Sequence, residues 1–115
     1  MVARLLDLYR HELEIYRRVL ALSERQGDLV REGADFAEVR RVLEEKKRCL
    51  AVIARLENDE ATTKSAWERD RRDLPAAERG RVHRALQGVA DLIEQILAVE
   101  EANDNDLIQR TGVLG

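Results

Sequence analysis

Aromatic residues, proline and cysteine are scarce in this chain of 115 residues. Aromatics make up 3% of it, and there is one proline and one cysteine. A lone cysteine, Cys49, cannot form a disulfide within the chain, which agrees with a reducing compartment. A single proline, Pro75, leaves long stretches free to continue as helix. The composition therefore argues against a disulfide-stabilised domain and permits long helices.

Long hydrophobic runs are also missing. No apolar stretch approaches the ~18 residues that a membrane-spanning helix needs. The N-terminal segment MVARLLDLYRHELEIY carries charges every few residues, unlike the apolar core of a signal peptide. The formal net charge of −3 gives no general attraction to nucleic acid or to an anionic membrane. We therefore expect a cytoplasmic protein with no membrane insertion.

Arginines are concentrated in the middle of the chain, between Arg69 and Arg84. Acidic residues such as Asp70, Asp73 and Glu78 are interleaved with them. No aromatics alternate with these bases, although nucleobases need aromatic side chains on which to stack. We interpret the arginines as solvated helix faces and expect no nucleic-acid partner.

Charged residues are abundant, at 37% of the chain, and apolar residues recur at helical spacing. A first run alternates by four and three over more than four heptads, which predicts a helix over residues 2–32. Gly33 follows as a suitable C′ residue, since glycine adopts positive φ without steric cost. The positions of this seam are Val2, Leu6, Tyr9, Leu13, Tyr16, Leu20, Ser23, Gly27 and Val30.

A second helix, over residues 36–70, is predicted to start at a capped turn. Asp35 is a suitable N-cap, and Glu38 is placed to bond back to the Asp35 N–H as in a capping box. Because the connection is short, we expect the first two helices to be antiparallel and in contact. Their predicted contacts join Leu13, Tyr16 and Leu20 to Val39, Leu43 and Leu50.

Pro75 suits the first turn of a third helix, predicted over residues 76–110. Its seam becomes polar at Glu100 and Asn103 after an apolar run of Val82, Leu86, Val89, Ile93 and Ile96. The fold class expected is therefore all-α. Residues 1–115 should form a single domain, an elongated antiparallel three-helix bundle with coiled-coil-like seams.

Lys46 falls on the apolar stripe of the second helix, one heptad after Val39 and one before Ile53. We expect its methylene groups to pack while its amine reaches water at the edge of the bundle. Setting the register of the helices is an alternative role, as is contact with a partner.

Residues with catalytic or metal-binding chemistry are few. There is no Gly-rich phosphate loop, no HExxH and no cysteine pair. His11 shares a helix face with Asp7 and Glu14, which could hold a metal, but a solvated face with a helix-stabilising pair explains them more simply. His83 lies among arginines, and Cys49 reads as a small buried hydrophobe. We expect no enzyme activity, no cofactor and no metal.

The end of the third helix is the predicted partner-binding site. Apolar residues return at Leu107 and Ile108 after the polar positions of the seam, and six acids but no base lie between Asp91 and Asp106. Such a segment is weakly held by its own helix. We therefore predict that residues 99–115 are mobile and bind a partner helix through Val99, Leu107 and Ile108.

The sequence resembles the FlgN-type flagellar export chaperones, which are small helical proteins of bacteria. The resemblance rests on LLDLYRHELEIYRRVLALSERQGDLV, then REGADFAEVRRVLEEKKRCLAVIARLE, then EEANDNDLI. It covers the Gly33 and Asp35 turn, Lys46 within an apolar pattern, and Asn103 and Asn105 before an apolar pair. By this resemblance the two asparagines belong to the partner-binding site.

The resemblance implies a function in flagellar assembly. Such a chaperone binds hook-associated (hook–filament junction) proteins before type III secretion and delivers them to the export apparatus. This chain ends at QRTGVLG, without an aromatic after Trp67, so the resemblance implies client binding more directly than docking on that apparatus. The alternative is a structural protein that forms a homodimer or larger oligomer through the same apolar stripe.

Overall fold

The computed structural model describes residues 1–111, and these are helical almost throughout. The elements are α1 (Val2–Arg31), α2 (Phe36–Asp59), α3 (Ala61–Asp70), the short 3₁₀ turn η1 (Arg71–Asp73) and α4 (Ala76–Thr111). The extents of 57 × 21 × 19 Å confirm the elongated all-α fold. Across the described range there is no strand, and no helix is both long and apolar enough to cross a membrane.

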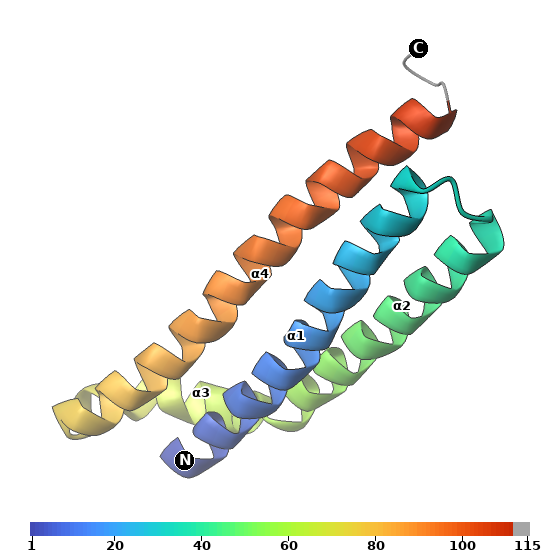
Figure 1. Cartoon of the computed structure of the whole chain (residues 1–115). Coiled ribbons are helices and arrows are strands. Elements are labelled where there is room, and N and C mark those ends of the chain that lie inside the picture. Colours follow the sequence, from blue (N-terminus) through green and yellow to red (C-terminus); the bar gives the residue numbers. More distant parts are fainter. Residues whose placement is uncertain (112–115) are drawn as a thin grey trace.

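Helix α1 lies between α2 and α4 (Figure 1). It makes the main backbone packing contacts with both neighbours, whereas within residues 1–111 α2 and α4 meet mainly through side chains. Helix α2 runs antiparallel to α1, as predicted, and α4 runs parallel to α1. Helix α1 therefore packs against both α2 and α4, and a groove between α2 and α4 is left on one side of the bundle.

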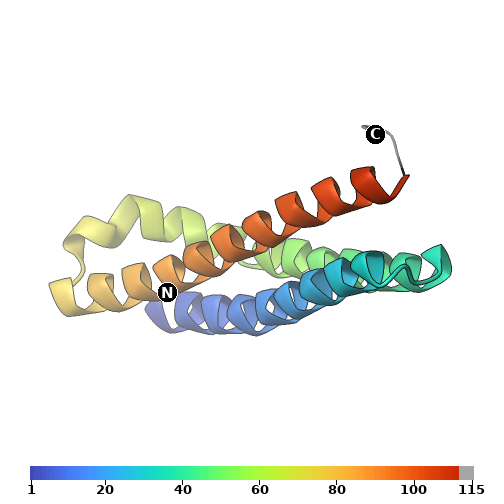
Figure 2. The same ribbon diagram turned by 45° about the horizontal axis from the view of Figure 1, so that its top comes forward.

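The predicted single helix over residues 36–70 is wrong, because the chain bends at Glu60 and continues as α3. The Glu60 backbone leaves helical geometry at φ −103° and ψ 13°. Its carboxylate accepts hydrogen bonds from Arg4 Nε at 3.1 Å and from Thr63 Oγ1 at 2.8 Å, which ties this corner to the start of α1. The bend turns α3 across the end of the bundle, where the N-terminus and the start of α4 lie (Figure 2).

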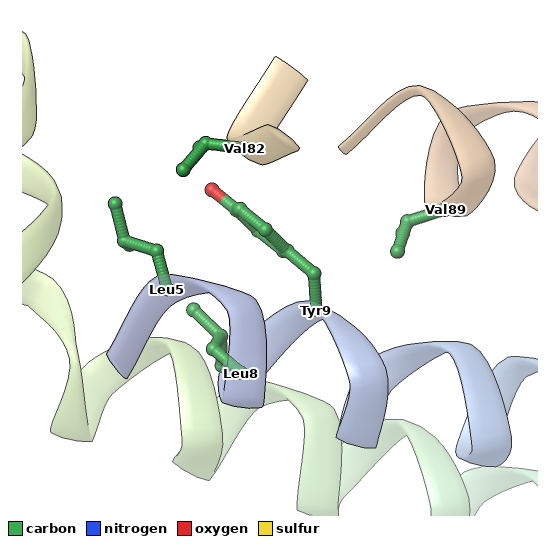
Figure 3. Close-up of a cluster of buried hydrophobic side chains, with 5 residues drawn as sticks. All are labelled: Leu5, Leu8, Tyr9, Val82 and Val89. Carbon is green, nitrogen blue, oxygen red and sulfur yellow. The ribbon is translucent and has the colours of Figure 1, made fainter. Parts of the chain in front are cut away.

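The largest core cluster joins the N-terminal halves of α1 and α4. Leu5, Leu8 and Tyr9 of α1 meet Val82 and Val89 of α4, with the Tyr9 ring directed from α1 toward α4 (Figure 3). Each of these side chains is at most 4% exposed, so each contributes roughly 1.5–3 kcal/mol of burial free energy. Trp67 of α3 packs against the same cluster, which explains why the chain turns back at Glu60.

Two further clusters follow along α1. Val19 packs with Leu92 and Ile96 of α4, and Leu29 and Val30 pack with Val39 of α2. The predicted packing of Leu43 and Leu50 is wrong, because these two side chains are 44% and 47% exposed. Helix α2 turns the column of Val39, Lys46 and Ile53 inward instead, and the two leucines face the groove side.

The connection between α1 and α2 forms at the predicted residues. Gly33 has a φ of 71°, and the Gly33 and Ala34 N–H groups donate to the carbonyls of Val30 and Leu29 at 3.2 and 3.0 Å. This is a Schellman motif, which satisfies the last carbonyls of α1. Asp35 Oδ1 accepts from the Ala37 N–H at 3.1 Å, which confirms the N-cap.

The second hydrogen bond of the predicted capping box, between the Asp35 N–H and the Glu38 carboxylate, does not form, so this prediction is wrong. Among the described residues, the Asp35 N–H donates no hydrogen bond to the Glu38 carboxylate, which is exposed. The Glu38 N–H donates to the Asp35 carbonyl at 3.0 Å, as an ordinary first-turn contact. The start of α2 therefore depends on Asp35 alone.

Candidate functional site

A buried polar network lies inside the bundle where the predicted seam becomes polar. Lys46 Nζ of α2 donates to Gln26 Oε1 of α1 at 2.8 Å and also to Glu100 of α4. Glu100 Oε1 also accepts from Ser23 Oγ at 2.6 Å. Asn103 Nδ2 donates to the Ser23 carbonyl at 2.7 Å. One polar cluster thus joins all three long helices.

The expectation that the Lys46 amine reaches water is wrong. The Lys46 side chain is only 9% exposed, and its ammonium is paired with the carboxylate of Glu100, which is 28% exposed. An ammonium that is withdrawn from water needs such a partner. The polar residues of the α4 seam are therefore occupied within the bundle, and Lys46 fixes the height of α2 relative to α4.

The five predicted partner-binding residues do not form one surface. Asn103 is 1% exposed and Leu107 packs against the cluster of Leu29, Val30 and Val39. Asn105 is exposed, Ile108 is half-buried, and Val99 lines a shallow pocket beside Asp28 and Arg31 of α1. Residues 99–111 continue α4 along α1, and residues 112–115, which include the Val113 and Leu114 end of the predicted segment, lie outside the described residues.

An open and mostly apolar groove lies between α2 and α4. It encloses about 440 Å³, and α1 forms its floor through Tyr16 and Val19. Its walls are Lys46 and Leu50 of α2 and Ile93, Ile96, Leu97 and Glu100 of α4. Leu50 and Leu97 are 47% and 62% exposed, so both leucines face solvent across the opening. We call this surface the α2/α4 groove.

Two further leucines at heptad spacing lengthen the α2/α4 groove. Leu43 precedes Leu50 by seven residues, and Leu86 precedes Ile93 by seven, and both are 44% exposed. The Lys46–Glu100 pair places Leu43 at the height of Asn103, since α2 and α4 run in opposite directions. The 17 residue steps of α4 from Leu86 to Asn103 correspond to about 26 Å. The groove therefore matches a helix of about five turns.

The two rims of the α2/α4 groove carry opposite charges. Arg40 and Lys47 flank Leu43 and Leu50 on the groove side of α2, at spacings of three and four residues that share a helix face. The α4 rim, which flanks Leu97 in the same way, carries three acids. All five side chains are exposed, and within residues 1–111 none makes an ion pair. The acids are Glu94, Glu101 and Asp104.

A second buried polar group lies lower in the bundle, at Glu12 of α1. Its side chain is 2% exposed, and Oε1 has no hydrogen-bond partner. Burial, followed by a hydrogen bond with the Glu57 carboxylate, raises the pKa of Glu12 to about 8. The same hydrogen bond and the ammonium of Lys64 lower the pKa of Glu57. Burial and the neighbouring Glu57 carboxylate therefore favour the protonated form of Glu12 and the ionised form of Glu57.

The residues with metal-binding chemistry do not assemble into a centre. Asp7, His11 and Glu14 lie on one exposed face of α1, where Arg10 NH1 donates to Asp7 Oδ1 at 3.3 Å and adds a positive charge. Among residues 1–111, no group of three or more His, Cys, Asp or Glu side chains is arranged to hold a metal ion. Cys49 is half-buried beside Leu20 and Val19.

Comparison with models of protein families, with curated proteins and with solved structures found no match to this chain. The features of the chain itself, above all the α2/α4 groove, therefore carry the functional argument.

Sequence reasoning missed the groove and the two buried polar groups. Leu43 and Leu50 look like core residues in the sequence, and only the rotation of α2 about its axis turns them outward. A signal for Glu12 and Gln26 does exist. Both belong to a heptad column with Leu5 and Val19, in which all four side chains are buried, so two polar residues interrupt an otherwise apolar column.

Proposed function

We propose that this chain binds an amphipathic helix of another protein in the α2/α4 groove, as a cytoplasmic export chaperone of flagellar hook-associated proteins. The observation that carries the proposal is the groove itself, an apolar surface with exposed Leu50 and Leu97 on its walls. The exposed leucines at positions 43 and 86 extend this apolar surface to about five helical turns. A helix laid along such a groove buries one apolar face through residues spaced by three and four. The resemblance of the sequence to FlgN-type chaperones supplies the candidate client.

The groove selects a helix by charge as well as by apolar surface. Arg40 and Lys47 favour acidic residues on one flank of the client helix. Glu94, Glu101 and Asp104 favour basic residues on its other flank. Rim charges of this kind steer association and fix orientation more than they add affinity. The client helix we propose therefore has an apolar stripe between an acidic and a basic edge.

Calorimetry with the helical terminal segment of a hook-associated protein tests this proposal. We expect Leu50→Asp and Leu97→Asp each to weaken binding at least tenfold, since a buried leucine contributes roughly 1.5–3 kcal/mol. Val52→Asp is the matched control, because Val52 is 39% exposed on another face of α2. Equal binding by all three variants would contradict the groove as the client site.

A second copy of the chain is the other occupant that the charges of the groove favour, which would make the protein a self-associating structural bundle. Rotation by 180° about an axis parallel to the helices leaves the height of every residue unchanged. Two copies placed groove to groove about such an axis therefore have α2 of one opposite α4 of the other. Because Lys46 and Glu100 pair within one chain and α2 and α4 run in opposite directions, Lys47 of one copy lies only about 3 Å in height from Glu101 of the other, within reach of two long side chains.

Charge reversal distinguishes the two occupants. In such a dimer, Lys47→Glu alone or Glu101→Lys alone sets like charges opposite each other in both symmetric pairs. A mixture of the two variants restores opposite charges in both pairs. Dimers in light scattering that are lost in each variant and recovered in the mixture would indicate the self-associating protein. A monomer under all these conditions, with groove-dependent client binding, supports the chaperone.

A further inference from the structure

A second pocket lies at the end of the bundle where α3, η1 and the start of α4 meet. It encloses about 550 Å³ and is separate from the α2/α4 groove. Its walls come from two segments that face each other across the Pro75 turn. The lining residues are Trp67 of α3, Arg71 and Arg72 of η1, and Arg79, Gly80 and His83 of α4. We call it the Trp67 pocket.

All the charged residues that line the Trp67 pocket are basic. No acidic residue lines it, and within residues 1–111 neither Arg72, Arg79 nor His83 has an ion-pair partner. Arg71 makes a long ion pair with Glu68, at 4.0 Å. Like charges in one pocket repel each other, and a bound anion would remove that repulsion. The positive field is local, because the whole chain has a net charge of −3.

One arginine of the pocket, Arg79, is anchored across it. Arg79 NH1 donates to the carbonyl oxygen of Arg72 at 3.1 Å, which joins the α4 wall to η1. A guanidinium fixed in this way loses little freedom when it binds a carboxylate through two parallel hydrogen bonds.

Trp67 gives the same pocket an apolar surface. The side chain is half-buried, since part of it packs against the cluster of Leu5, Tyr9 and Val82 and part of it lines the pocket. Gly80 opposite has no side chain, so the α4 wall is low between Arg79 and His83. The pocket therefore offers an indole surface bordered by guanidinium groups. A suitable ligand carries carboxylates next to an apolar side chain.

We propose that the Trp67 pocket binds an acidic peptide segment of a partner protein, with an apolar side chain against Trp67 and carboxylates on Arg72 and Arg79. A small anion is less suitable, because such ligands are normally enclosed over 70–90% of their surface, whereas Arg71, Arg72 and His83 lie exposed. Single-stranded nucleic acid stacks on several aromatics along a basic groove, and Trp67 is the one aromatic between residues 61 and 111. This inference does not depend on the client helix in the α2/α4 groove.

Trp67 is itself the reporter for the test, because it is the only tryptophan of the chain. The probe is a synthetic twelve-residue peptide of alternating Glu and Leu, with a peptide of alternating Lys and Leu as its counterpart. We expect the acidic peptide to change Trp67 fluorescence saturably. Raising the salt from 50 to 300 mM should weaken binding roughly tenfold, since the contacts are between charges. No change in Trp67 emission, or an equal response to both peptides, would overturn the proposal.

Paired variants assign the response to the pocket. Arg72→Gln with Arg79→Gln should weaken the acidic peptide at least tenfold while circular dichroism stays unchanged. The control is Arg17→Gln with Arg25→Gln, which removes the same charge from exposed positions on α1 and should leave binding within twofold. An equal loss of peptide affinity in both double variants would show that binding depends only on net charge, and would overturn the Trp67 pocket as the binding site. If an oligonucleotide of equal charge binds more tightly than the acidic peptide, the proposal that the ligand is a peptide would be overturned.

Discussion

Glu100→Leu should destabilise the bundle by about 2–3 kcal/mol, because it leaves the ammonium of Lys46 buried without its charged partner. Breaking a fully buried ion pair from one side costs about 3–5 kcal/mol. Glu100 is 28% exposed while Lys46 is 9% exposed, so the pair is only partly buried and the expected loss lies at or below the lower limit of that range. Gln26 Oε1 still accepts from Lys46 Nζ at 2.8 Å and limits the damage further.

The reverse change, Lys46→Met, should destabilise less, by about 1–2 kcal/mol. Glu100 can turn toward water through its exposed edge and still accepts from Ser23 Oγ. Lys46→Met together with Glu100→Leu replaces the pair by apolar groups beside Leu50 and Ile96. That double variant should lie within about 1 kcal/mol of the unmodified chain, since apolar replacement of a buried pair is often neutral or stabilising.

Urea unfolding followed by far-ultraviolet circular dichroism measures this cycle. Because the double variant should be about as stable as the unmodified chain, we predict a coupling free energy of about 3–5 kcal/mol between positions 46 and 100, with unchanged m-values. Destabilisations that add in the double variant, or a Glu100→Leu variant as stable as the unmodified chain, would show that the Lys46 amine reaches water. The reasoning about the buried network would then be refuted.

Three other predictions follow from single positions. Gly27→Ala should destabilise the protein, because the added Cβ would overlap Asn103 Oδ1. A Cβ at Gly88 would have no atom within 4 Å, so Gly88→Ala should stabilise α4 by about 1 kcal/mol. The two variants should therefore shift the urea midpoint in opposite directions. Asp35→Ala should lower the free energy of unfolding by about 1 kcal/mol, because it removes the hydrogen bond from the Ala37 N–H, and Glu38→Ala should lower it clearly less. Equal urea midpoints for Asp35→Ala and the unmodified chain would contradict the N-cap. The folded-state pKa of Glu12 is raised to about 8 from an ordinary 4.5. Between these pH values the folded protein therefore binds more protons than the unfolded chain. The free energy of unfolding should then fall as pH rises from 5 to 8, by at most about 1.4 kcal/mol per pH unit. The pKa of Glu57 is lowered, so Glu57 changes the stability only at pH values below the ordinary pKa of a glutamate. Glu12→Gln should therefore flatten the dependence of stability on pH between pH 5 and 8. An unchanged slope in this variant would contradict the assignment to Glu12.

Local signals in the sequence predict most of the fold. Gly33 and Asp35 are sufficient to locate the turn between α1 and α2, because positive φ and an N-cap are properties of single residues. The start of α4 after Pro75 follows in the same way. The bend at Glu60 could not be predicted from the sequence, since it depends on Arg4 from the start of α1 and on the packing of Trp67 across the bundle end.

The candidate site was less predictable than the fold, because it depends on how the helices are rotated. Periodicity shows that Leu43 and Leu50 share a broad stripe with Val39 and Lys46, but not which edge of the stripe is buried. The polar seam of α4 suggested a weakly held end, whereas Glu100 and Asn103 bond to Lys46 and Ser23 within the bundle. Two polar columns that are unremarkable on separate helices become one network only when the helices are assembled.

Site-specific photo-crosslinking tests the central claim, that a client helix lies in the α2/α4 groove, most directly. A photoreactive amino acid is placed in turn at positions 50 and 97 on the groove walls, and at positions 52 and 105 on other exposed faces. Each variant is then illuminated with the helical terminal segment of a hook-associated protein. We predict crosslinks from positions 50 and 97 and few from 52 and 105. Crosslinks confined to position 105 at the end of α4, or equal yields from all four positions, would contradict the groove as the client site.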